Sequence, residues 1–494
     1  MAEVRVITAM CKSRQVEEAY ELAKKDYVSD ASSPWAQRAL GWALYYMIKT
    51  DVENGSYDKL IEHIKELKEL NLLTVANDNM IFDNVQLQMG TFIKKHIPLN
   101  DNEAPVKLST LFHLLRDYSF NSSLGHSVLL QSYIKFDAWS EMADFLDWWN
   151  LDTFRDEDFT PFVTPRGNKV TTLVEQAFNA NSKALLRQDD LGRIEEFLPK
   201  LDSLMTSHPE MMYPGYFYGK LLLKLGSNTE EALKVIVPFV RKKASEFWAW
   251  QLLSDVYAHD PEKQLACLLR AVHCKTQETF LGKVRIKLAS TYIQMNQLGR
   301  ARHHIDIVTR CYASQGWNLP NEVECWIHQP WFNTTTPNGN DAIDFLDITN
   351  KILCDGTKEA IAIVTYVDPK SHKATIVYGL EKRMAFKFKS YVGVCSILKI
   401  NYIEDADGKV KILNTAKATL PNNLEYIKVV TGVVSKHEKN DFAFLKSSVG
   451  SCFIPGDIVG KYNVVNGEQI KVLAVYAYNR KKEVWNWICV SIKR

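Results

Sequence analysis

The residues best suited to chemistry are aromatic and basic side chains that alternate near the C-terminus. Phe442, Phe444 and Phe453 occupy two short apolar runs, and their basic neighbours are Lys436, His437 and Lys446. Aromatic rings stack on nucleobases and basic side chains hold phosphates, so these residue types suit single-stranded nucleic acid. The alternative is a structural or docking module without a nucleic-acid ligand.

An earlier stretch contains a second set of the same kind. Its stacking candidates are Tyr378, Phe386 and Phe388, and a basic strip beside them comprises Lys382, Arg383, Lys387 and Lys389. The pattern leaves open whether this set binds anything. The run Arg480-Lys481-Lys482 falls in a predicted hairpin turn, where it either holds phosphates or is simply solvated.

The chain lacks the sequence motifs of common catalytic and cofactor sites: no P-loop, GxSxG, HExxH or dinucleotide fingerprint is present. His303 and His304 are adjacent on a predicted helix and therefore point about 100° apart, so we expect ordinary surface or groove residues. The carboxylate pair Asp189-Asp190 falls in a loop at a predicted helix start, where helix capping explains it. Cys325 and His328 lack the further ligands of a zinc site. We expect no metal, no cofactor and no catalysis, with an unrecognised nuclease as an alternative.

Alternation of apolar and polar residues predicts that strands position these side chains. The last five strands are predicted at Gly432–Ser435, Asp441–Lys446, Cys452–Pro455, Gln469–Ala477 and Val484–Ile492. Five earlier ones are predicted at Ala360–Asp368, Lys373–Tyr378, Met384–Phe388, Val392–Ile403 and Lys409–Thr415. Five strands in about 60 residues is the size of a small Greek-key barrel. We predict a tandem duplication of one barrel type, at 341–420 and 421–494.

The last set of strands resembles a cold-shock domain, which is an OB-type barrel. The resemblance is carried by Gly432 and Val434 in strand one, Asn440–Leu445 in strand two, Cys452–Pro455 in strand three and Gly467–Ile470 at the entry to strand four. It implies an OB fold that binds single-stranded nucleic acid, RNA in preference to DNA.

Three positions depart from the pattern of that family. The strand-one Trp-Phe pair falls on Lys436 and His437, and the strand-three histidine falls on Pro455. The strand-two glycine that lets a base approach is Ala443. The resemblance therefore implies a ligand surface narrower than in the family, centred on the three phenylalanines.

The first two thirds of the chain read as helices, since apolar residues recur at i, i+3, i+4 and i+7 between about residue 14 and residue 315. Three sets of residues recur at spacings of 34 or 35: Gly219, Ser254 and Ala289; Leu222, Tyr257 and Tyr292; Ala232, Ala266 and Ala301. Small residues at such positions let two antiparallel helices approach closely. The pattern resembles the tetratricopeptide repeat.

An N-terminal unit shows the same pattern, with Leu40, Gly41 and Tyr45 in its first helix and a predicted loop at Thr50–Ser56. The resemblance implies an α-solenoid at 1–315 whose concave face binds a protein partner. A spacer or a self-association surface is the alternative. The aromatic cluster of Trp139, Phe145, Trp148, Trp149 and Phe154 has helical spacing, so we expect it in the core.

A junction at 316–340 contains Trp317, Trp326 and Trp331 and ends in a Thr/Pro/Asn/Gly run typical of a boundary loop. The tryptophans are expected either to cap the apolar end of the solenoid or to dock the next domain on it.

The composition of the 494 residues is that of a multidomain globular protein. Residues 341–494 carry 23 Lys and Arg against 16 Asp and Glu, whereas residues 1–340 carry 37 against 42. A basic C-terminal third suits a polyanionic partner. Nine cysteines without a pairing framework indicate a cytoplasmic location, and no apolar run is long enough to span a membrane.

The fold class predicted is thus a tetratricopeptide-like α-solenoid followed by two small OB-type, cold-shock-like β-barrels. This domain order is similar to that of tetratricopeptide-plus-cold-shock proteins of bacterial conflict operons, which act in defence. It implies a non-enzymatic adaptor that holds single-stranded nucleic acid on its barrels and a protein partner on its solenoid. A scaffold that binds only proteins is the runner-up.

Overall fold

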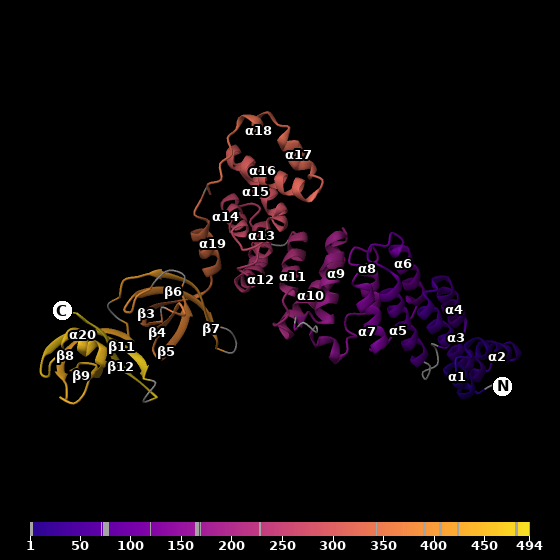
Figure 1. Ribbon diagram of the computed structural model, residues 1–494, viewed down its shortest axis with the longest axis horizontal. Helices are drawn as coiled ribbons and strands as arrows, with labels where there is room; N and C mark the ends of the chain where they lie inside the picture. The colour runs from indigo at the N-terminus through magenta and orange to yellow at the C-terminus, as the bar shows by residue number, and fades with distance from the viewer. Residues whose placement is uncertain are drawn as a thin grey trace. The chain divides into compact units, whose positions relative to one another are not determined.

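The computed structural model describes residues 3–70, 72, 79–118, 120–163, 167, 169–226, 229–341, 343–368, 370–388, 392–404, 408–421, 424–479 and 483–493. Lys389 and the run Arg480-Lys481-Lys482, both singled out above, lie outside these residues. Helices come first and β-sheets follow (Figure 1), which confirms the predicted fold class. The chain divides into two compact units, residues 1–239 and 240–494, so the division falls inside the predicted solenoid.

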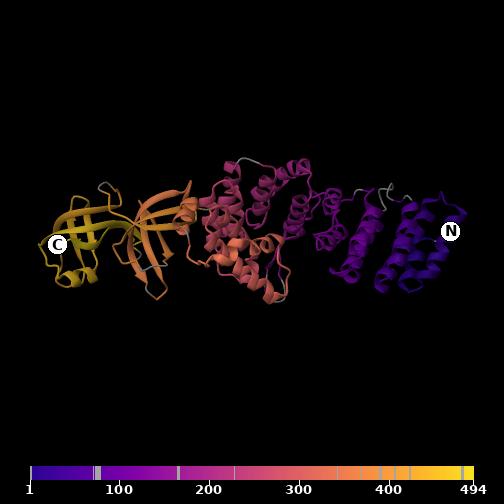
Figure 2. The same cartoon turned by 90° about the horizontal axis from the view of Figure 1, so that it is seen from above.

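The first unit is an array of helices (Figures 1 and 2) with one short two-stranded hairpin. Its helices are α1 (Val4–Lys12), α2 (Val16–Ser29), α3 (Pro34–Asn54), α4 (Tyr57–Glu69), α5 (Asn79–His96), α6 (Ala104–Leu115), α7 (Leu124–Tyr133), α8 (Met142–Trp149), the 3₁₀ turn η2 (Asp156–Phe159), α9 (Leu173–Arg187), α10 (Leu191–Ser207), α11 (Pro214–Lys224) and most of α12 (Thr229–Lys242). The hairpin pairs β1 (Phe162–Val163) with β2 (Lys169–Val170).

Helix ends in this unit follow local capping chemistry. The Ser33 hydroxyl accepts a hydrogen bond from the Ala36 amide at the start of α3, and Gly55 ends that helix at a φ of 70°. The predicted loop at Thr50–Ser56 is therefore wrong: α3 continues to Asn54 because Asp51 and Val52 pack into the interior. At α10, the Asp190 carboxylate caps the helix by accepting from the Arg193 amide, as predicted.

The aromatic cluster forms part of the core of the first unit, as predicted. Trp139, Phe145 and Trp149 are buried, and Trp148 and Phe154 pack against the same core while partly exposed. The rings of Phe145 and Tyr133 stack 4.1 Å apart. These rings fill helix crossings and are not free to bind a ligand.

The second unit begins with helical pairs. They comprise the end of α12, α13 (Phe247–Val256), α14 (Pro261–Val272), η3 (Glu278–Phe280), α15 (Gly282–Gln294), α16 (Leu298–Gln315), α17 (Asn321–Ile327), α18 (Pro330–Thr334) and α19 (Phe345–Cys354). Helix α13 packs on α14, and α15 packs on α16. All nine repeat positions from Gly219 to Ala301 are buried, which is what close helix pairing requires.

The tryptophan-rich junction caps the helical pairs, as one of the two predictions had it. Trp326 and Trp331, on α17 and α18, pack against a core that includes Ile305 and Val308, while Trp317 stays half exposed. The predicted boundary at residue 341 precedes a further helix, α19, which packs on α14. The Arg241 guanidinium donates to the Leu353 carbonyl at 2.7 Å, so the C-terminal end of α19 is held to α12.

Two five-stranded sheets follow, and their strand orders correspond. The first sheet holds β3 (Lys358–Asp368), β4 (Lys373–Gly379), β5 (Lys382–Lys387), β6 (Ile397–Glu404) and β7 (Val410–Lys417) in the order β5-β4-β3-β6-β7. The second is a closed barrel of β8 (Ile427–Ser435), β9 (Ala443–Ser447), β10 (Gly450–Ile454), β11 (Gln469–Asn479) and β12 (Val484–Lys493) in the order β10-β12-β11-β8-β9, with α20 (Gly456–Tyr462) between β10 and β11.

The two sheets have the same strand order, but the first sheet is open between its third and fifth strands, where the second sheet is closed. In the barrel the third and fifth strands, β10 and β12, pair in parallel and close it. The corresponding strands β5 and β7 are the edges of the first sheet among the described residues. The predicted duplication is thus confirmed in strand order, whereas a closed barrel is formed only by the second set.

Strand β11 belongs to the barrel and also packs against the first sheet. The two sheets lie side by side in both views (Figures 1 and 2). One face of β11 enters the barrel core through Val472 and Ala474. The opposite face presents Leu473 and Val475, which pack against the first sheet in a separate buried cluster. The Tyr426 hydroxyl adds a hydrogen bond of 2.6 Å to the Ile361 carbonyl. The two sheets therefore share an apolar interface.

Candidate nucleic-acid interface

The three phenylalanines of the barrel form one cluster. The ring centroids of Phe442, Phe444 and Phe453 are separated by 5.8 Å, 5.6 Å and 5.7 Å, and each ring is partly exposed. Such separations are typical of edge-to-face and tilted aromatic pairs. The structure thus brings together the three side chains on which the sequence prediction depends.

Strand register explains why these rings face outward. Phe444 pairs with Phe453 across β9 and β10, and alternation turns both to the same side of the sheet. Their neighbours Ala443 and Leu445 point the other way and are buried in the barrel core. The cluster therefore lies on the outer face of the second and third strands, where OB folds bind oligonucleotides.

Ala443 does not narrow this surface. The family resemblance placed it where a glycine lets a base approach, but its methyl group is 1% exposed and lies in the core. The Ala443 methyl group therefore does not obstruct the approach of a base to the outer face.

The basic residues around the cluster differ in their exposure and in whether a hydrogen bond holds the side chain. Lys446 is exposed, follows Phe444 on the same face of β9, and pairs with Ser451 and Val433 in the strands on either side. His437 is exposed. Lys436 donates through Nζ to the Val464 carbonyl at 3.4 Å, which ties it to the segment before β11. Lys446 is thus the cation best placed to hold a phosphate beside the rings.

The stacking candidates of the first sheet face its interior. Tyr378 is 7% exposed, and its ring lies 5.3 Å from Tyr402 in the core, so it is unavailable to a base and the prediction is wrong. Phe386 and Phe388 are partly buried and pack against the same core. The alternating pattern correctly predicted strands, but the face that carries the aromatic residues is the inner face of the sheet.

The outer face of β3, β4 and β5 carries polar and basic residues instead. Arg383, from the predicted basic strip, lies there with Lys373 and Tyr366, the last of which is 61% exposed. Together with Thr365, Asp368, Ser371, Thr375, Val377, Ala385, Ala477 and Tyr478, these residues line a groove of about 460 Å³. The groove runs between the first sheet and β11.

A second aromatic group on the β11–β12 hairpin escaped the sequence analysis. Tyr476, Tyr478, Trp485 and Trp487 are each partly exposed, with Tyr476 stacked on Trp485 at 6.1 Å and 20°. Tyr476 pairs with Trp487 and Tyr478 pairs with Trp485 across the two strands. The signal was present as YAY and WNW on paired runs, where alternation places four rings on one face.

Two cations lie over these hairpin rings. The Lys428 amino group is 5.4 Å from the Trp487 ring centroid. The Arg383 guanidinium, which comes from the first sheet, is 5.6 Å from the Tyr478 ring centroid. Both separations fall within the range of cation–π attraction. Basic and aromatic groups therefore alternate here as they do beside the phenylalanines.

The barrel interior carries no reactive group. Burial raises the pKa of the Cys452 and Cys489 thiols to about 12, so both are protonated and behave as small apolar side chains. In the described part of the chain, no group of three His, Cys, Asp or Glu side chains could hold a metal ion. The imidazole of His328 bonds its own helix through Nδ1 and the Glu324 carbonyl.

The two adjacent histidines on α16 are not equivalent. His304 is buried, contrary to the expectation of a surface or groove residue, and its Nδ1 lies 3.0 Å from the Arg285 guanidinium. Burial lowers the pKa of His304 to about 3, so its ring is neutral and accepts this hydrogen bond. His304 therefore accepts a hydrogen bond from the partly buried Arg285, which is also paired with Glu278.

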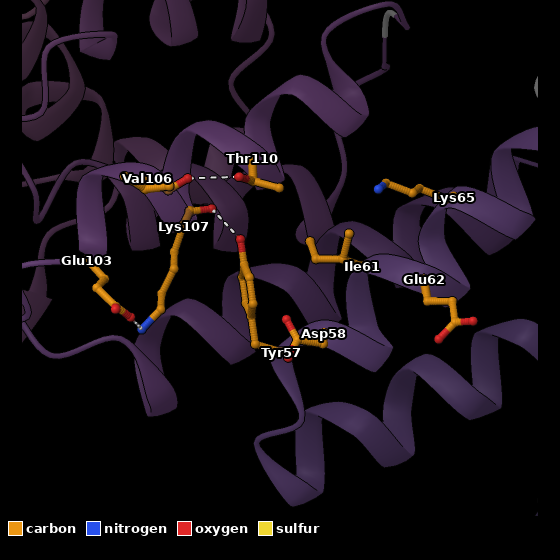
Figure 3. Close-up of a pocket in the computed structure, with 9 residues that line it drawn as sticks. All are labelled: Tyr57, Asp58, Ile61, Glu62, Lys65, Glu103, Val106, Lys107 and Thr110. Atoms are coloured by element: carbon orange, nitrogen blue, oxygen red, sulfur yellow. Dashed lines mark hydrogen bonds and ion pairs between the residues drawn. The ribbon is translucent and has the colours of Figure 1, made fainter.

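A separate groove lies in the first unit between α4 and α6 (Figure 3). It encloses about 700 Å³ and is lined by Tyr57, Asp58, Ile61, Glu62, Lys65, Glu103, Val106, Lys107 and Thr110. Figure 3 shows the Tyr57 hydroxyl directed at the Lys107 carbonyl, a hydrogen bond of 3.4 Å, and Lys107 paired with Glu103 at 3.0 Å. Val106 is 69% exposed beside these charges. A mixed rim around an exposed apolar residue suits a peptide.

Comparison with known proteins finds two family matches on separate parts of the chain. Residues 428–492 match S1/CSD-like domain 2 of the TOTE conflict systems. Residues 212–348 match a domain of unknown function, DUF7017, and so cover the helical pairs with the 34–35-residue spacing. No curated protein and no solved structure matches the chain. The first match confirms the predicted cold-shock-like domain and its similarity to conflict-system proteins.

No helix in the described residues is both long enough and apolar enough to cross a membrane.

Proposed function

We propose that the protein is a non-enzymatic adaptor of a conflict system that binds single-stranded nucleic acid, RNA in preference to DNA, through its C-terminal sheets. In this proposal the tetratricopeptide-like array of helices binds a protein partner. The nine cysteines are all unpaired, which supports a cytoplasmic location.

One observation carries the nucleic-acid part. Phe442, Phe444 and Phe453 cluster on the outer face of the second and third strands of a closed OB-order barrel, with Lys446 beside them. This barrel is the segment that is similar to an S1/CSD-like domain. Each base stacked on an aromatic ring contributes roughly 1–3 kcal/mol, so three rings give a useful affinity for a single strand.

The test is the binding of the full chain to labelled oligouridylate and oligodeoxythymidylate at several salt concentrations. We expect salt-dependent binding, tighter for RNA, that weakens at least tenfold in the double variant Phe442→Ala/Phe453→Ala. Phe280→Ala is the matched control, because that phenylalanine is 61% exposed on the helical part. Equal binding by the parent and the double variant would sink the proposed site.

The protein partner is assigned to the groove between α4 and α6. Its exposed Val106 and its charged rim support a peptide-sized ligand. A photocrosslinking amino acid at position 106 should capture a partner in the native cell, whereas the same group at Val28, which is 77% exposed, should not. Identical captures at both positions would argue against a specific groove.

Two alternatives predict different outcomes. A scaffold that binds only proteins would show no salt-dependent oligonucleotide binding. A nuclease would shorten RNA or DNA during incubation with the full chain and Mg²⁺, whereas an adaptor leaves both intact.

A further inference from the structure

The outer faces of the two sheets correspond to each other. The phenylalanine cluster occupies the second and third strands of the barrel, β9 and β10. In the first sheet the second and third strands are β4 and β5, and their outer face carries Lys373 and Arg383. That face forms one wall of the groove beside β11. The duplicated fold thus presents its OB-type ligand face twice.

Strand pairing connects the two faces. Phe453 on β10 pairs with Ile488 on β12, and Ile488 pairs with Val475 on β11. Val475 packs against Ile363 and Val377 of the first sheet. Adjacent strands lie about 4.8 Å apart, so only two strand spacings separate the phenylalanine cluster from β11, whose Ala477 and Tyr478 line the groove.

The hairpin supplies one ring to the groove, that of Tyr478. Tyr476 and Trp487 continue the strand faces of Val472, Ala474 and Cys489, which enter the barrel core, so they lie on the side opposite the phenylalanines and outside this path. Arg383 reaches the Tyr478 ring from the first sheet, and this contact places a guanidinium of one sheet on an aromatic ring of the other. The one carboxylate in the groove, Asp368, accepts from the Ser371 hydroxyl at 2.6 Å and from the Lys370 amide at 3.0 Å. Its charge is therefore partly satisfied within its own turn.

We propose that the nucleic-acid site extends from the phenylalanine cluster across the β11–β12 hairpin into the groove of the first sheet, so that one single strand is held by both sheets. This inference rests on the proposed function and deepens it, since it adds Tyr478, Arg383, Lys373 and Tyr366 to the site. Rings interleaved with cations favour a single strand over a duplex, whose bases are already stacked.

The test varies the length of the oligonucleotide. The full chain is titrated with labelled oligouridylates of about 4 and about 16 nucleotides, the range that one OB fold covers. The variants are Arg383→Gln, Tyr366→Ala and Tyr478→Ala. Lys399→Gln is the matched control, because Lys399 is a cation of the same sheet that is ion-paired with Glu359 at 2.9 Å. Circular dichroism checks that each variant is folded.

We expect the three groove and hairpin variants to bind the long oligonucleotide at least fivefold more weakly than the parent, the lower end of one base–ring contact. Their affinity for the short one should change less than twofold, as should that of Lys399→Gln for either. Equal affinity of parent and variants for the long oligonucleotide overturns the extended site. If Tyr478→Ala fails to fold, the variants of the exposed Tyr366 and the partly exposed Arg383 decide the matter.

The proposed function and its extension fail in different ways. If the parent binds, and Phe442→Ala/Phe453→Ala weakens both lengths while the groove variants change neither, the extension falls and the phenylalanine site stands. If the groove variants weaken binding and the phenylalanine variant does not, the groove is a site by itself and the proposed route from the phenylalanines is overturned. Absence of any binding by the parent overturns both.

Discussion

At the level of single residues, the inward direction of the Ala443 side chain decides what the cold-shock resemblance means for binding. Its methyl group is buried with Leu445 and Cys452 in the barrel core. Restoring the family glycine with Ala443→Gly should leave oligonucleotide affinity within twofold. It should lower the free energy of unfolding by about 1 kcal/mol, because a strand glycine costs backbone entropy and the buried methyl is lost.

Anisotropy titration and thermal unfolding of the same samples measure both quantities. Phe444→Ala is the contrasting variant, since its ring is on the outer face, and it should weaken binding by fivefold or more. A gain in affinity for Ala443→Gly would show that the residue limits access after all.

A second prediction at this scale concerns His126 in the first unit. Its ring stacks on Trp149 at 4.4 Å, and Nε2 donates to the Trp149 carbonyl at 3.0 Å. Burial lowers its pKa to about 4 from an ordinary value of 6.5. The unfolded chain therefore binds the proton more readily, and stability is lost as the pH falls from 6.5 to 4. At pH 4.5 the loss from this group alone is on the order of 2–3 kcal/mol.

Hydrogen exchange of α7 reports this effect locally, which is preferable for a chain of two units. Protection factors of α7 amides should fall between pH 7 and pH 4.5. In His126→Asn, protection should start lower, because the stacking is gone, and fall less. An equal fall in parent and variant would mean that another group carries the pH dependence.

Residue types and spacing were enough to predict the phenylalanine cluster, but not which side of a strand faces out. Phe444 and Phe453 alternate with smaller core residues, so periodicity and burial agree. In the first sheet, Phe386 and Phe388 alternate with Ala385 and Lys387, and both phases are chemically plausible. The choice depends on where the sheet packs, which is a tertiary property: the aromatic side faces the core, and Arg383 is left outside.

Among the elements, β8 shows why a glycine in a strand can be obligatory. A Cβ at Gly432 would meet the Lys446 carbonyl oxygen of β9 closer than van der Waals contact allows. Gly432→Ala should therefore destabilise the barrel by about 1–3 kcal/mol, the usual cost of overpacking. Gly460→Ala on α20 is the matched control, since a Cβ there meets nothing within 4 Å.

The control substitution should be neutral or slightly stabilising, because alanine is a better helix former than glycine. Thermal unfolding followed by near-ultraviolet circular dichroism, to which the two tryptophans of β12 contribute, distinguishes the two. Equal melting temperatures would indicate that the β8 and β9 backbones separate at little cost.

Element bounds were predictable where pattern and burial coincide. Eight of ten strand predictions in the C-terminal third overlap closely with β3–β5, β7 and β9–β12, since each run alternates between turns. The run Gly432–Ser435 covers only the end of β8, which begins at Ile427. The run Val392–Ile403 was extended too far, because β6 begins only at Ile397. The helix α19 was not predicted, and its residues were included in the first barrel. Its packing against α14, which places it with the helices, is a tertiary contact that the sequence does not show.

At the scale of the whole molecule, the shared face of β11 argues that the two sheets fold and act as one module. Ile363 and Val377 of the first sheet, and Ile427, Leu473 and Val475 of the second, are each 5% exposed or less. The sequence predicted two separate domains at 341–420 and 421–494, although the continuous apolar run Val472–Tyr476 is the pattern of a strand buried on both faces.

A fragment of residues 421–494 should therefore be unstable in spite of its closed barrel, because it exposes the Leu473 and Val475 face to water. A fragment of residues 355–494, which begins after α19, keeps that face covered. We expect the shorter fragment to bind a hydrophobic dye and to aggregate near room temperature, and the longer one to melt cooperatively. The variant Leu473→Lys/Val475→Thr should restore solubility to the short fragment while disrupting the long one. A short fragment that is soluble and cooperative without substitution would show that the barrel is independent, and the interface between the sheets would then be a weak contact, too weak to hold one strand of nucleic acid across both.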